Sequence, residues 1–290
     1  MSNSLLTAKS ALRETLAQSG PRLLRNDELR NLLTTAKKRW GVVKSVGPMR
    51  FIRFLVDECG LREARLESER YEARVRYLWG DVSPYVVALS LRAGGYISHG
   101  SAVFIHGLTD QVPKTIYVNL EQSPKPKPRL GLSQERIDLA FSHRQRLSNL
   151  SYRFDAYTIV LLSGKHTGKL GVVDAKLDKR TRVPVTGLER TLVDIVVRPA
   201  YAGGLIQVLE AYRGAREHVS VPRLKRTIKA LEYIYPYHQA IGYLLERAEY
   251  PSDSLRTLRA IGAQFDFYLG YGLREKEYDP GWRIFYPKGF

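Results

Sequence analysis

Two histidines, His99 and His106, are the side chains of this sequence that first suggest a metal site. They are seven residues apart in an apolar stretch, so within a helix they share one face. At about 1.5 Å of rise per residue they lie about 10 Å apart along the axis, too far for one metal ion to bridge. We therefore predict a structural role for each histidine, with a hydrogen bond to the backbone, and no metal site.

An acid-x-lysine sequence, Asp174-Ala175-Lys176, follows an apolar run, and Asp155 is a further acid upstream. Many metal-dependent nucleases use such residues to hold magnesium and to polarise water. The pattern is only three residues long and arises often by chance. A nuclease that uses Asp155, Asp174 and Lys176 is therefore an alternative function rather than the favoured one.

Other catalytic patterns fail on spacing or on residue type. Residues 164–170, GKHTGKL, are one residue short of a phosphate-binding loop, and a leucine replaces the hydroxyl residue that would hold magnesium. The sequence has no G-x-S-x-G, no H-E-x-x-H and only one cysteine, Cys59, which excludes an internal disulfide and a cysteine-rich zinc site. We expect no catalytic residues and no cofactor, and thus no enzyme.

The composition points to a polyanionic partner. The 290 residues carry a net charge of +17, with 44% hydrophobic residues, which fits one large domain or two ordinary ones. Such an excess of Lys and Arg favours nucleic acid first and a membrane surface second. There is no run of 18 apolar residues and no secretory signal at the N-terminus, so we expect a cytoplasmic protein without a membrane partner.

Residues 1–95 show the pattern of a winged helix-turn-helix. Apolar residues recur at helical spacing over residues 5–16, 29–36 and 52–59, with Gly47-Pro48 opening the third helix. Between residues 71 and 79 the period changes to two, which predicts a strand, and residues 64–66 precede it as the other half of a hairpin. Three helices and then a hairpin is the order of a fold that sets its third helix in the major groove of DNA.

Residues 1–80 hold 16 Lys and Arg against 9 Asp and Glu, an excess of seven positive charges. Arg50 and Arg53 share one face of the third helix, and Arg74 and Arg76 share one face of the hairpin. Basic residues at the end of the second helix and in the loop after it extend this surface. The full set of predicted DNA-binding residues is Lys37, Lys38, Arg39, Lys44, Arg50, Arg53, Arg74 and Arg76.

Residues 96–290 read as a mixed α/β module. Ser98 can cap a short buried helix that Gly107 ends, and strand-like runs follow at residues 136–141, 157–162 and 170–177. A basic, proline-rich loop at residues 123–129 is predicted to lie on the surface.

The later half of this module is predicted to be mainly helical. Thr186-Gly-Leu-Glu189 has the spacing of a capping box, and Arg190 and Asp194 are four apart on the helix that follows, so they can pair. Further helical patterns continue to about residue 261, and a turn and a strand end the chain.

Two segments of this module resemble a known family. ISHGSAVFIHGLTDQVP at residues 97–113, followed by IYVN, and VTGLERTLVDIVVRPAYAGG at residues 185–204 are similar to the AbiEi family, the antitoxins of type IV toxin–antitoxin systems in phage defence. IGYLLERA at residues 241–248 is a weaker match. The resemblance implies a winged helix that represses the protein's own promoter. It also implies neutralisation of a nucleotidyltransferase toxin without a stable complex. The candidates for antitoxin function are Ser98, His99, His106, Glu189, Arg190 and Asp194.

These observations predict an α+β protein with a winged helix-turn-helix at residues 1–95 and an α/β antitoxin domain at residues 96–290. Duplex DNA and a toxin are the expected partners. Two other functions stay open, namely the D-x-K nuclease described above and a plain winged-helix transcription factor whose second module senses a ligand or dimerises.

Overall fold

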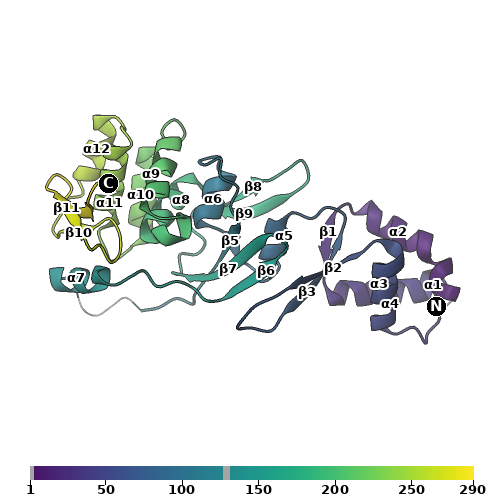
Figure 1. Ribbon diagram of the computed structural model, residues 1–290. Coiled ribbons are helices and arrows are strands. Elements are labelled where there is room, and N and C mark those ends of the chain that lie inside the picture. Colours follow the sequence, from purple (N-terminus) through teal and green to yellow (C-terminus); the bar gives the residue numbers. More distant parts are fainter. Residues whose placement is uncertain (1–2, 127–130) are drawn as a thin grey trace. The chain divides into compact units, whose positions relative to one another are not determined.

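The computed structural model describes residues 3–126 and 131–290 (Figure 1). The protein is mixed α+β, and its contacts divide it into two units. The first unit contains residues 1–91 and 150–159, and the second contains residues 92–149 and 160–290. The chain therefore returns once to the first unit, a feature that the two consecutive modules predicted from the sequence do not include.

The first unit combines short helices with a three-stranded antiparallel sheet of order β1-β3-β2. Its elements up to residue 91 are α1 (Asn3–Thr7), α2 (Lys9–Gln18), β1 (Arg22–Leu24), α3 (Asn26–Arg39), α4 (Pro48–Phe54), a π-helical turn η1 (Leu55–Cys59), β2 (Arg62–Leu66), β3 (Arg74–Trp79) and α5 (Pro84–Leu89). The three predicted helices and the hairpin are all present. The first predicted helix is divided into α1 and α2, however, because the helix is interrupted at Ala8. The three-residue strand β1 was not predicted.

Local signals in the sequence explain where these helices begin and end. The carboxylate of Glu28 accepts a hydrogen bond from the backbone N–H of Arg25 at the start of α3. Pro48 lies in the first turn of α4, where its missing N–H has no helical acceptor, and Gly60 ends the following π turn with a left-handed φ of +88°. Their inward residues, Leu29 and Phe51 among them, are fully buried in one core.

The second unit is built around a six-stranded sheet of order β6-β7-β5-β4-β9-β8 and a layer of helices. The strands are β4 (Tyr96–Ile97), β5 (Thr115–Glu121), β6 (Ser151–Phe154), β7 (Tyr157–Gly164), β8 (Val172–Lys176) and β9 (Arg182–Thr186), and β6 with the start of β7 belongs to the first unit. The helices are α6 (His99–Ile105), α7 (Gln134–Ser142), α8 (Leu188–Val197), η2 (Pro199–Ala202, a 3-10 helix), α9 (Leu205–Gly214), α10 (Val221–Leu231), α11 (Tyr237–Arg247) and α12 (Ser252–Arg259). A small sheet, β10 (Phe267–Tyr268), β12 (Ile284–Pro287) and β11 (Lys276–Asp279), ends the chain.

One predicted strand is wrong. Residues 136–141 form most of helix α7, because Ile137 and Phe141 are four apart and both are buried on one helix face. Of the predicted surface loop at 123–129, residues 123–126 are exposed and residues 127–130 lie outside the described part of the chain.

Helix α8 is the centre of the second core. Every residue from Arg190 to Val197 is buried, and the helix packs against α6, α9, α10 and α11. In the ribbon of Figure 1, α8 to α11 lie together on one side of the unit. Within residues 3–126 and 131–290, none of the helices has the length and apolar character needed to cross a membrane.

Candidate functional site

The two segments that carry the family resemblance lie against each other. Strand β4 pairs in parallel with β9 through Ile97 and Val185, and α6 packs on α8 and η2. Nε2 of His106 donates a hydrogen bond to the carbonyl oxygen of Thr186 at 2.6 Å, which confirms the predicted backbone contact of this histidine. Gly100 approaches Tyr201 so closely that a Cβ at residue 100 would lie 2.9 Å from its carbonyl oxygen. Residues far apart in the sequence therefore form one compact region.

His99 occupies an unusual position in this region. Its backbone is left-handed, with φ +52°, and its side chain is 8% exposed. Its ring lies edge-on to Tyr117 and Tyr201, at centroid distances of 6.3 and 5.3 Å. Burial, with the nearby positive charges of Arg190 and Arg198, lowers the pKa of His99 to about 3, so the imidazole is neutral at pH 7.

The hydrogen bond of His99 differs from the prediction. Its partner is a side chain rather than a backbone group, since Nδ1 lies 2.9 Å from the hydroxyl oxygen of Ser98. Ser98 does occupy the N-cap position of α6, but its side chain makes no capping bond to the helix. The backbone at His99 is left-handed, and the Ser98 hydroxyl contacts the imidazole rather than a backbone N–H of the helix.

A buried ion pair lies in the second motif. Nε of Arg190 donates to Oδ1 of Asp194 at 2.8 Å, and both residues are about 95% buried, which confirms the predicted pairing along the helix. Nη1 of Arg190 also donates to the carbonyl oxygen of Leu170 at 2.8 Å and to the Thr167 hydroxyl at 3.2 Å. Burial raises the pKa of Asp194 to about 6, although Arg190 acts against this shift.

Glu121 extends the same network, and sequence reasoning missed it. Its carboxylate accepts hydrogen bonds from the backbone N–H of Thr167 at 2.9 Å, from the backbone N–H of Lys169 at 3.1 Å and from the Tyr96 hydroxyl at 3.2 Å. Burial alone would raise the pKa of Glu121, but the hydrogen bonds from Thr167 and Lys169 lower it. The residues 164–170 that superficially resemble a phosphate loop therefore hold a carboxylate of the protein itself.

The predicted capping box at the start of α8 is wrong. Gly187 is the N-cap residue and no side chain caps the helix. The Thr186 hydroxyl faces inward and lies 2.8 Å from the hydroxyl of Thr191. Glu189 instead accepts hydrogen bonds from the backbone N–H of Ser220 at 3.3 Å and from Nε of Arg223 at 2.9 Å. Because these groups begin α10, Glu189 joins two helices.

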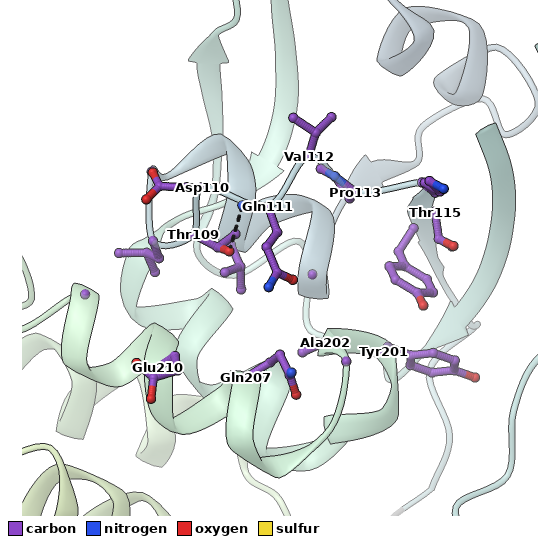
Figure 2. Close-up of a pocket in the computed structure, with 18 of the residues that line it drawn as sticks. Thr109, Asp110, Gln111, Val112, Pro113, Thr115, Tyr201, Ala202, Gln207 and Glu210 are labelled. Carbon is purple, nitrogen blue, oxygen red and sulfur yellow. Dashed lines mark hydrogen bonds between the residues drawn. The ribbon is translucent and has the colours of Figure 1, made fainter. Parts of the chain in front are cut away.

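An open groove of about 790 Å³ borders this region (Figure 2). The loop after α6 forms one wall, while η2 and α9 form the other. Figure 2 shows Gln111 reaching from the loop toward Gln207 on α9, whereas Val112 points away. The charged lining residues have both signs and are Asp110, Lys114, Glu210 and Arg213. The volume suits a small ligand, but the mixed charges favour no single ligand class.

In the first unit, most of the predicted DNA-binding residues lie exposed along the end of α3, the following loop and α4. The exposed ones are Lys38, Arg39, Lys44, Arg50 and Arg53. Lys37 is partly buried and its Nζ donates to the carbonyl oxygen of Lys44 at 3.0 Å. The exposed positive charges therefore come from two consecutive helices that pack against each other.

The hairpin β2–β3 presents fewer free positive charges than the surface formed by the end of α3, the following loop and α4. Arg74 is exposed, but the guanidinium of Arg76 donates to the Ser90 hydroxyl at 2.9 Å and to the carbonyl oxygens of Ser90 at 3.0 Å and Val75 at 2.8 Å. Arg76 thus has partners inside the unit. The hairpin tip, residues 67–73, contains three glutamates and one arginine, so it is acidic.

The residues of the nuclease alternative, Asp155, Asp174 and Lys176, lie on the protein surface. Asp155 pairs with Arg62 at 3.2 Å, and Asp174 and Lys176 are exposed on β8. Among the residues that the structure describes, no group of three or more His, Cys, Asp or Glu side chains is arranged to hold a metal ion.

Comparison with known proteins supports the fold alone. No family model matches the chain, and no curated protein matches it. The crystal structure of the Rv2827c protein from Mycobacterium tuberculosis is similar, with a TM-score of 0.60 and 18% sequence identity over 97% of this chain and 91% of that one. The similarity covers nearly the whole length of both chains, so this chain has a similar fold.

Proposed function

We propose that this protein is a cytoplasmic, DNA-binding antitoxin that represses its own type IV toxin–antitoxin operon and neutralises a nucleotidyltransferase toxin. The observation that carries the proposal is the packing of the two AbiEi-like segments into one region through β4, β9, α6 and α8. Their contact supports the reading of both as parts of one functional module.

The first unit supports the DNA-binding half of the proposal. Its order of two short helices, a strand, two helices and a hairpin, with β1 paired to β3, supports the assignment of a winged helix-turn-helix. In such folds the N-terminal residues of the recognition helix contact base edges. Here that helix is α4, whose Arg50 and Arg53 are exposed, as are Lys38 and Arg39 at the end of α3. The acidic hairpin tip favours the helix over the wing tip as the DNA contact, because phosphates repel carboxylates.

A promoter assay tests the repressor function in the full chain. We expect Arg50→Ala/Arg53→Ala to abolish repression of a reporter placed behind the protein's own promoter. Arg13→Ala/Arg70→Ala is the matched control, because it removes the same charge from exposed positions on α2 and the acidic tip. Binding of the wild-type protein to promoter DNA should also weaken steeply as salt rises. Equal loss of repression in both variants would contradict the proposed reading surface.

A growth assay tests the antitoxin function and separates it from its alternatives. Cells made to express the proposed cognate nucleotidyltransferase toxin should be rescued by the full chain supplied from an unrelated promoter. Arg50→Ala/Arg53→Ala should rescue equally well, because neutralisation is assigned to the second unit. Repression without any rescue would favour a plain transcription factor. Magnesium-dependent cleavage of nucleic acid that is lost in Asp174→Ala/Lys176→Ala would favour the nuclease.

A further inference from the structure

Met49 is an apolar side chain that the fold does not bury. It lies in the first turn of α4 and is 79% exposed, the highest value among the large exposed apolar residues of the described chain. Its neighbours Phe51, Ile52 and Phe54 are buried in the core of the first unit. Folding therefore uses the other face of α4 and leaves the methionine in water, where it gains nothing from packing.

Met49 shares its helix face with two arginines. Arg50 is adjacent and Arg53 is four residues on, so the three side chains leave α4 on the same side, and all three are exposed. The acidic residues of this segment, Asp57 and Glu58, lie at its other end, where Glu58 is held by Nζ of Lys9 at 2.8 Å. The N-terminal half of the segment thus presents one flexible apolar group beside two positive charges.

The major groove of DNA offers a matching set of groups. Guanine presents two acceptors that an arginine can bind in a bidentate manner, and the C5-methyl group of thymine is the apolar group on its edges. A methionine is long and flexible enough to cover such a methyl group. Resting on the DNA-binding function proposed above, we propose that Met49 reads a thymine methyl group while Arg50 and Arg53 contact the neighbouring bases.

Removing that methyl group from the DNA tests the contact. Sequences bound by the full-length protein are first enriched from a pool of randomised duplexes. Each thymine of the enriched sequence is then replaced in turn by deoxyuridine, which lacks only the methyl group. We expect one replacement to weaken binding of the wild-type protein about fourfold, which corresponds to one methyl group removed from a contact. Met49→Ala should bind the thymine and deoxyuridine duplexes equally.

Leu6→Ala is the control, because it shortens an apolar side chain of the same unit that is 45% exposed on α1. It should keep the wild-type sensitivity to deoxyuridine. The inference is overturned if no replacement affects the wild-type protein, or if Met49→Ala keeps the same sensitivity. Failure to bind any duplex would overturn the proposed DNA-binding function as well, so the two failures are distinguishable.

Discussion

The buried, neutral His99 makes the stability of the second unit depend on pH. Its pKa in the folded protein is about 3, lowered mainly by burial, against about 6.5 in an unfolded chain. A group with a lowered folded pKa contributes stability above its unfolded pKa and loses that contribution as the pH falls toward the folded value. We therefore predict that acidification from pH 7 to pH 5 destabilises the unit. In this range His99 becomes protonated in the unfolded chain but stays neutral in the folded protein.

The expected magnitude follows from the two pKa values. At pH 5 the unfolded imidazole is about 1.5 pH units below its pKa, and each unit corresponds to about 1.4 kcal/mol. The folded imidazole is still neutral at this pH, and its 8% exposure means that solvent screens it little. His99 should therefore lower the free energy of unfolding by about 2 kcal/mol between pH 7 and pH 5.

Tryptophan fluorescence can follow the second unit alone. The sequence has three tryptophans, of which Trp40 and Trp79 lie in the first unit and Trp282 is buried in the second core. In a Trp40→Phe/Trp79→Phe background, urea unfolding monitored through Trp282 reports the second unit. The comparison protein adds His99→Asn, because asparagine tolerates a left-handed backbone and does not titrate.

The difference between the two proteins is the quantity that tests the reasoning. Asp194 acts in the opposite direction, since its raised pKa of about 6 adds stability as the pH falls through that value, but it is present in both proteins and cancels. We expect the protein with His99 to lose about 2 kcal/mol more than His99→Asn between pH 7 and pH 5. Equal losses would show that the imidazole is protonated in the folded state and that its burial has been misjudged.

Three further substitutions test other contacts by urea unfolding. Asp194→Ala should cost about 3–5 kcal/mol, because it leaves the charge of Arg190 buried without its carboxylate partner, whereas Asp194→Leu/Arg190→Leu should cost less. Glu189→Ala should cost about 1 kcal/mol and keep toxin neutralisation, and complete loss of neutralisation at unchanged stability would make Glu189 a functional residue. Gly242→Ala should cost about 1–3 kcal/mol, because the new methyl group would overlap the ring of Trp282.

Sequence reasoning succeeded where a local signal determines the structure. The spacing of Arg190 and Asp194 fixes their contact, because residues four apart in a helix are neighbours whatever surrounds them. Gly47-Pro48 and Gly60 likewise mark the start and end of one helical segment through backbone conformation alone. Such signals need no knowledge of the tertiary fold.

The errors arise where a distant part of the chain determines the partner of a side chain or the type of secondary structure. Glu189 has the spacing of a capping residue, but its carboxylate accepts hydrogen bonds from Ser220 and Arg223 at the start of another helix. Glu121 belongs to no motif, and only the fold brings it to Thr167 and into the network around Arg190. The apolar residues of 136–141 fit a strand or a helix, and their packing partners determine which one forms.

The return of residues 150–159 to the first unit has a consequence for synthesis on the ribosome. The backbone of Glu67 bridges that of Arg153, and Arg62 pairs with Asp155, so this later hairpin lies against the edge strand β2. Residues 92–159 must be translated before this hairpin can pack against β2, which takes roughly 3–14 s at about 5–20 residues per second. During that interval the nascent chain carries an open strand edge, the kind of surface that pairs with other chains. Rare codons or pauses within this span should therefore lower the yield of correctly folded protein more than pauses placed after residue 160.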